Sequence, residues 1–194
     1  MERLNYRMAN LRIKGIGLTL GFEEFCNGWN DICLKSSVEE KGAKFEEYFL
    51  ENVMLPFIPK GYRTVKQSKI RGIDYKFDFL IVRKNAFEYF GVAPQDVLAA
   101  FEVKSHGFYS QPNIERVKFT FETVQKAYPQ IKLFYVTYRE TNYYDRKARL
   151  FFGNKVRWYY RLSDSGDGVQ IPPKSYFPNE WKRLIENLST LKSV

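Results

Sequence analysis

Two charged residues interrupt an apolar stretch near the middle of the chain. In AAFEVKSHGF, residues 99–108, Glu102 and Lys104 stand two apart, with apolar neighbours before and between them. Side chains alternate along a strand, so both would project from one face, about 7 Å apart. A second acid, Asp78, interrupts the apolar stretch KFDFLIV. If these two strands pair, the two carboxylates lie side by side and repel each other unless a cation neutralises them.

This set of groups would support the hydrolysis of a phosphodiester bond. Hard oxygen ligands at strand ends suit Mg²⁺, which lowers the pKa of a bound water and offsets charge on a phosphate. Lys104 would stand beside the metal ion and hold the attacking water or the phosphate. The E-x-K spacing alone is weak evidence, because four other acid-x-Lys pairs begin at Glu39, Asp74, Asp145 and Glu180.

The composition is that of a folded protein with a polyanionic partner. The chain has 194 residues, of which 44% are hydrophobic and 18% aromatic, and its net charge is +9. These values argue against intrinsic disorder, and the charge favours nucleic acid as the partner. No apolar run is long enough for a membrane span. Cys26 and Cys33 are expected to be reduced thiols of a cytoplasmic protein.

A helix is predicted shortly before the polar strands. Ser37 followed three residues later by Glu40 forms a capping box, which starts a helix over residues 38–54. Gly42 inside this helix costs about 1 kcal/mol relative to alanine, and a close packing contact is the expected reason for it. An earlier short helix is expected to be interrupted at Gly28.

The remaining pattern predicts a single α/β domain over residues 1–194. Strands are expected over residues 73–82, 97–104, 131–138, 148–152 (ARLFF) and 155–161 (KVRWYYR). A helix over 113–128 links the second and third of these strands as a parallel β-α-β unit. The fold class is therefore a central mixed β-sheet flanked by α-helices, with its core at about 36–138 and peripheral elements at 1–35 and 139–194.

Four of these features, taken in order, resemble the PD-(D/E)XK nuclease superfamily, whose fold is called restriction-endonuclease-like. KGAKFEEYF is similar to the first core helix, KFDFLIV to the strand with the metal-binding aspartate, and FEVKS to the (D/E)-x-K strand. The helix and strand over 113–138 are similar to the continuation of the common core. Phe77 stands in place of the proline that names the motif.

The resemblance implies a role for each candidate residue. Asp78 and Glu102 would bind the metal ion, with the Val103 backbone carbonyl as a third ligand. Lys104 would be the catalytic lysine. Glu46 would complete the site from the first helix, where it would bind a second metal ion or an ordered water.

Two neighbouring acids remain alternatives as ligands. Asp74 could replace Asp78, but it lies at the mouth of the strand, where a carboxylate needs no special explanation. Asp78 lies inside the apolar strand, where it does need one, so Asp78 is favoured. Glu47 could replace Glu46, because either of these adjacent acids could simply be solvated.

The predicted activity is that of a Mg²⁺-dependent endodeoxyribonuclease with one or two metal ions per site, in which Mn²⁺ can substitute. A type II restriction endonuclease, or the cleavage subunit of one, is the first interpretation. The alternatives are a repair, junction-resolving or mobile-element nuclease, or a DNA-binding protein on this scaffold that does not cut. The expected partners are double-stranded DNA and either a second copy of the chain or a heterologous recognition subunit.

Basic and aromatic side chains outside these motifs are predicted to face the DNA. The stretch KGYRTVKQSKIR and residues 138–161 interleave cations, which can bind phosphate, with aromatic rings, which can stack on exposed bases. The individual candidates are Lys69, Arg71, Ser105, His106, Tyr109, Arg146 and Lys147.

Overall fold

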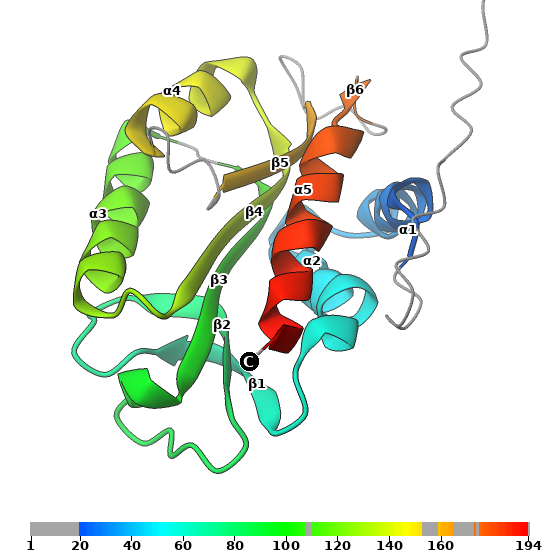
Figure 1. Ribbon diagram of the computed structural model, residues 1–194. Helices are drawn as coiled ribbons and strands as arrows, with labels where there is room; N and C mark the ends of the chain where they lie inside the picture. Colours follow the sequence, from blue (N-terminus) through cyan, green and yellow to red (C-terminus); the bar gives the residue numbers. More distant parts are fainter. Residues whose placement is uncertain (1–19, 108–109, 153–158, 165–172, 174, 194) are drawn as a thin grey trace, which may run out of the picture.

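A six-stranded mixed sheet forms the centre of the computed structural model, which describes residues 20–107, 110–152, 159–164, 173 and 175–193 (Figure 1). The strands follow one another across the sheet in chain order: β1 Tyr62–Lys69, β2 Lys76–Arg83, β3 Val97–His106, β4 Lys132–Glu140, β5 Tyr159–Asp164 and β6 Ser175–Tyr176. β3, β4 and β5 run parallel, whereas the pairs β1–β2, β2–β3 and β5–β6 are antiparallel. The prediction of an α/β fold with a mixed sheet is confirmed.

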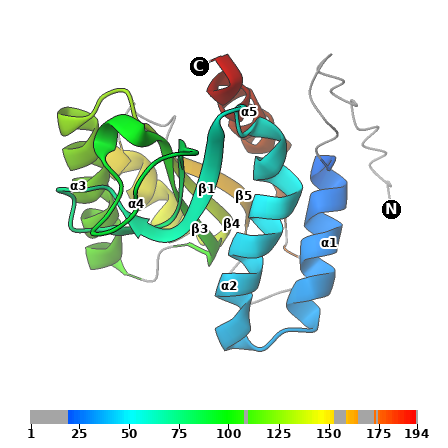
Figure 2. The ribbon, with the colours of Figure 1, turned by 90° about the horizontal axis from the view of Figure 1, so that it is seen from below.

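Helices cover both faces of this sheet (Figures 1 and 2). They are α1 Phe22–Leu34, α2 Val38–Phe49, α3 Gln111–Ala127, α4 Asn142–Phe152 and α5 Pro178–Ser189. A π-helical turn, Leu50–Met54, extends α2, and the short 3₁₀ turns are Leu55–Phe57, Pro94–Asp96 and Thr190–Ser193. α3 and α4 pack on one face, and α1, α2 and α5 pack on the other. None of the described helices is long and apolar enough to cross a membrane.

The two strands on which the predicted site depends do pair. β2 and β3 are antiparallel neighbours, and α3 links β3 to β4 as the predicted parallel β-α-β unit. Phe79, Phe101 and Phe134 come from these three strands, and their rings stack at centroid distances of 4.8 and 4.5 Å. Because these buried rings are close-packed, they fix the strands that carry the polar side chains.

One predicted strand is wrong. Residues 148–152 belong to α4, in which Tyr144 and Ala148 pack toward α3 and Arg149 pairs with Asp145 one turn earlier at 3.1 Å. The apolar residues of ARLFF suit a strand when they are considered alone. Together with the polar residues before them, they form one continuous helix. The following prediction at 155–161 is borne out from Tyr159 onward, where β5 begins, and its first residues lie outside the described part of the chain.

The close glycine contact lies at Gly28 and not at Gly42. α1 is continuous through Gly28, and the Tyr48 hydroxyl of α2 lies where a Cβ would be, donating a hydrogen bond to the Phe25 carbonyl at 3.1 Å. A Cβ at Gly42 would meet no described atom within 4 Å. Both expectations for these glycines were therefore wrong, since α1 needs Gly28 for packing whereas Gly42 is a solvent-exposed helical position.

Gly42→Ala is expected to stabilise the protein by about 0.5–1 kcal/mol, because alanine loses less backbone entropy in a helix. The midpoint of urea unfolding should rise accordingly. Gly28→Ala is the matched control and should lower this midpoint, because its methyl group displaces the Tyr48 hydroxyl. A midpoint that falls in Gly42→Ala would contradict the exposed position of this glycine.

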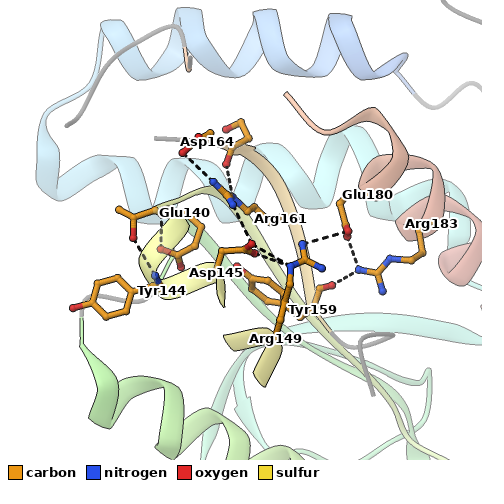
Figure 3. A network of polar contacts seen from close by, with 11 residues as sticks. Glu140, Tyr144, Asp145, Arg149, Tyr159, Arg161, Asp164, Glu180 and Arg183 are labelled. Atoms are coloured by element: carbon orange, nitrogen blue, oxygen red, sulfur yellow. Dashed lines mark hydrogen bonds and ion pairs between the residues drawn. The ribbon is translucent and has the colours of Figure 1, made fainter. Parts of the chain in front are cut away.

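Several arginines of residues 138–161 hold the structure together (Figure 3). Arg161 of β5 is buried, and its guanidinium contacts Asp145 of α4 at 3.1 Å and Asp164 at 2.9 Å. Arg149 of α4 contacts both Asp145 and Glu180 of α5. Since breaking a buried ion pair is costly, these cations join α4, β5 and α5 and are not part of a free DNA-facing surface.

Candidate active site

β2 and β3 separate next to Asp78. Their ladder ends at the pair Phe79–Phe101, whereas β3 remains paired with β4 as far as His106. Beyond the last pair, the Asp78 carboxylate replaces the β2 backbone as a hydrogen-bond acceptor for β3. Its Oδ2 atom accepts a hydrogen bond from the backbone N–H of Val103 at 2.7 Å. The acid that interrupts the apolar strand therefore satisfies a buried donor that the ladder no longer reaches.

Lys104 lies between the two predicted acids. Its Nζ atom is 2.8 Å from Asp78 Oδ2 and 2.8 Å from Glu102 Oε1. Both acids are buried, each only 5% exposed, whereas Lys104 is partly exposed. The structure thus brings together the three residues that the sequence selected from two separate strands.

Glu46 joins this group through a residue that the sequence analysis did not select. The Gln67 side-chain amide donates to Glu46 Oε2 and to Asp78 Oδ1, both at 3.2 Å. The backbone of Gln67 has φ 48°, a left-handed conformation that is rare for residues other than glycine and that clusters at functional sites. Nothing in the sequence marks Gln67, because its role depends on this local backbone and on β1 lying beside α2.

The alternative ligands lie elsewhere. The Asp74 side chain is 97% exposed and pairs with Lys69 at 2.5 Å. Glu47 is exposed and pairs with Lys66 at 3.5 Å. Of these two pairs of alternatives, the geometry gathers Asp78 and Glu46 around one point.

Burial and like charge raise the pKa of two acids of this site, Glu102 and Glu46. Burial, and then the neighbouring Asp78, raise the pKa of Glu102 to about 7. The same two causes raise the pKa of Glu46. Burial alone would lower the pKa of Lys104, but the Glu102 and Asp78 carboxylates outweigh it and raise this pKa. Lys104 therefore stays protonated at neutral pH while both acids face it.

The donor atoms present are of the kind that a hard divalent cation prefers. Glu102 Oε2 is buried and accepts no hydrogen bond from the described residues, although the Tyr75 hydroxyl is near enough to affect its pKa. A strand residue directs its N–H and C=O to the same side, so the Val103 carbonyl faces the gap that Asp78 closes. Within the described ranges, no three acid, histidine or cysteine side chains converge on one point. The carboxylates of Asp78 and Glu102 and the backbone carbonyl of Val103 are oxygen donors of the kind that suits Mg²⁺.

Stability should depend on pH through Glu102. Its folded-state pKa is raised, so the stability that it contributes is fully present below its unfolded pKa of about 4.3 and is lost as the pH rises toward about 7. In EDTA, Glu102→Gln should therefore lose less stability than the unchanged protein between pH 4.5 and 7.5. Urea unfolding at a series of pH values measures this. Parallel curves for the two proteins would show that Glu102 titrates normally.

A further cation lies close to the acids. Arg116 of α3 is exposed, and its guanidinium carbon lies 5.8 Å from the centre of the Tyr75 ring, next to Glu102. The sequence analysis missed this residue, because only the packing of α3 on the sheet brings it to β2. Arg116 can meet a phosphate that enters the site from the solvent.

Two of the predicted DNA contacts lie at the end of β3. Ser105 is buried and alternates with Lys104, so it belongs to the α2 side of the sheet. His106 is half-buried. Burial, and then Arg139 and Lys41, lower the pKa of His106 to about 4, so it is neutral at pH 7.

The other predicted contacts are spread over the molecule. Lys69 ends β1, and Arg71 follows in the turn, where its guanidinium donates to the Gly91 carbonyl at 3.4 Å. Arg146 and Lys147 lie on α4, and Lys147 donates to the Gln111 side chain at 2.9 Å. Tyr109 lies outside the described residues.

The comparisons with known proteins leave the site to be judged on its geometry. A scan against models of protein families and a search of curated proteins both found no match.

Proposed function

We propose that this protein is a Mg²⁺-dependent endodeoxyribonuclease with a restriction-endonuclease-like core. The observation that carries the proposal is the Lys104 ammonium, held 2.8 Å from both Asp78 and Glu102 where β2 and β3 separate. A salt bridge needed only for stability would not require two buried acids side by side, where burial and then the Asp78 charge raise the pKa of Glu102. Perturbed acids beside a cation suit the hydrolysis of a charged ester.

Each side chain has a distinct part in this proposal. Asp78, Glu102 and the Val103 carbonyl would hold Mg²⁺, which when bound acidifies a water and offsets charge on the phosphate. Lys104 donates hydrogen bonds to the attacking water or to a phosphate oxygen. Gln67 holds Asp78 and Glu46 in fixed orientations. Arg116 pairs with the phosphate backbone next to the scissile bond.

The proposed substrate is double-stranded DNA. The net charge of +9 favours a polyanion, and one site of this kind cuts one strand. A homodimer, or a complex with a separate recognition subunit, would cut both strands. We infer a type II restriction endonuclease or its cleavage subunit, with a repair, junction-resolving or mobile-element nuclease as the alternative.

Incubation of supercoiled plasmid with the protein tests this function. We expect nicked or linear DNA in Mg²⁺ or Mn²⁺ and intact plasmid in EDTA. Mapped ends at a fixed sequence would assign the protein to restriction, whereas cuts at junctions, flaps or gaps would assign it to repair or recombination. Plasmid that is bound but stays intact with every metal ion would contradict the nuclease and favour the non-catalytic DNA-binding protein.

A further inference from the structure

The connection between β2 and β3, residues 84–96, exposes three aromatic rings. It lies at the lower end of the sheet in Figure 1. Phe87, Tyr89 and Phe90 are 69%, 66% and 87% exposed. They contact one another, with ring centroids 6.2 Å apart for the first two and 4.3 Å apart for the last two. Aromatic side chains on a folded surface usually bury most of their area, so a cluster of this kind indicates a binding surface.

The backbone of this loop holds Phe90 outward at a conformational cost. Phe90 has φ 60°, in the left-handed region that disfavours residues with a Cβ. The next residues are fixed, because the Gly91 N–H donates to the Glu88 carbonyl at 3.0 Å and the Val92 N–H donates to the Lys69 carbonyl at 2.8 Å. A strained residue that is almost fully exposed gains nothing from the core. The strain therefore preorganises a ring for an external partner.

The charge around these rings favours a polyanion as this partner. Residues 60–96 contain eight Lys and Arg but only four Asp and Glu. The two acids of the loop are already paired, Glu88 with Arg63 and Asp96 with Arg83. Protein–protein interfaces are depleted in lysine at their centre, whereas surfaces for single-stranded nucleic acid combine cations with exposed rings.

A hollow beside Phe90 gives this surface depth. Its volume is about 330 Å³, and it is lined by Phe90 together with Lys69, Ile70, Gly72, Ile73 and Asp74. Lys69, which pairs with Asp74 at 2.5 Å, and the nearby Arg71 lie at its rim, on the strand end to which the loop is hydrogen-bonded. A nucleotide matches this hollow, because its base can stack on Phe90 and its phosphate can meet the cations at the rim.

We propose that residues 84–96, together with the turn 69–74, bind single-stranded DNA by stacking on its bases. The bases stack on the rings of Phe87, Tyr89 and Phe90. The phosphates bind to Lys69, Arg71 and Lys84. This binding tolerates any sequence, since every base offers a π face. The turn 69–74 begins two residues after Gln67, whose side-chain amide donates to Asp78 Oδ1 at 3.2 Å, so this surface lies beside the proposed active site. The proposal concerns binding in the absence of a metal ion and does not depend on cleavage.

Fluorescence anisotropy with a labelled oligothymidine of about 12 nucleotides tests the surface, because this length lies within the site size of known single-strand binders. The full-length protein is measured in EDTA, so that no metal-dependent cleavage occurs. Phe90→Ala and Tyr89→Ala should each weaken binding by about 5- to 100-fold. Phe119→Ala is the matched control, since Phe119 is 72% exposed but lies on α3 away from the loop. This control should bind within about twofold of the unchanged protein.

Phe90→Gly separates a binding role from damage to the fold. Glycine adopts the left-handed backbone freely, so this variant should raise Tm by about 2–4 °C while it loses binding. Three results would overturn the proposal: no binding of the oligonucleotide by the unchanged protein, equal binding by all loop variants, or equal loss in Phe119→Ala. Loop variants that disrupt a dimer in sedimentation but bind the oligonucleotide normally would also overturn it and assign the rings to a contact between copies. Plasmid cleavage is scored separately, so failure of the nuclease proposal is distinguishable from failure of this one.

Discussion

Asp78→Ala is expected to reduce plasmid cleavage by at least about 100- to 1000-fold, the loss that follows removal of one group that stabilises a transition state. The same change should lower the free energy of unfolding by about 1–3 kcal/mol, because it leaves buried donors unsatisfied. The backbone N–H of Val103 loses its acceptor at 2.7 Å, and Lys104 loses one of its two carboxylates. Initial rates of nicking and urea unfolding measure the two effects.

Asp74→Ala provides the control for this prediction. Asp74 lies on the approach to the same strand, but its side chain is 97% exposed and pairs only with Lys69 among the described residues. We expect unchanged cleavage and a change in stability of less than about 0.5 kcal/mol. If Asp74→Ala lost activity while Asp78→Ala kept it, the assignment of the metal ligand would have to be exchanged between these two acids.

The sequence predicted those site residues that interrupt an apolar strand pattern. Asp78 and Glu102 interrupt apolar strands, and buried carboxylates need partners, so their types and positions point to each other. The parallel β-α-β unit follows from its periodicity in the same way. For Asp78 and Glu102, strand alternation was enough to predict a shared site once the two strands were assumed to be neighbours.

Other parts depend on contacts between distant residues, which no local pattern contains. Gln67 reaches the site because an edge strand with a left-handed residue lies beside α2, and Arg116 does so because α3 packs over β2. Gly28 is needed because Tyr48 of the next helix approaches it. The apolar residues of 148–152 suit a strand or a helix equally well. The packing of α4 on α3 and its ion pairs to β5 and α5 favour the helix.

Lys104→Ala is expected to abolish cleavage to a similar extent, about 100- to 1000-fold, while duplex binding in EDTA stays within about threefold. Its effect on stability should depend on the metal ion. Without Lys104, the buried Asp78 and Glu102 face each other with no cation between them. We expect a loss of about 1–3 kcal/mol in EDTA, less than for a fully buried pair because Lys104 is partly exposed.

Mg²⁺ should restore much of this stability, because the ion supplies the positive charge that Lys104 provided. The rise of Tm on adding Mg²⁺ is therefore expected to be larger in Lys104→Ala than in the unchanged protein. Lys66→Ala is the matched control, since Lys66 pairs with the exposed Glu47 at 3.5 Å and should change neither cleavage nor the Mg²⁺ response. If Lys104→Ala cut DNA at the normal rate, Lys104 would only balance charge, and the site would have to be sought elsewhere. If Lys104→Ala lost cleavage but its Tm did not rise on adding Mg²⁺, the two acids would not bind a metal ion. Only the role of Lys104 as a cation would then stand.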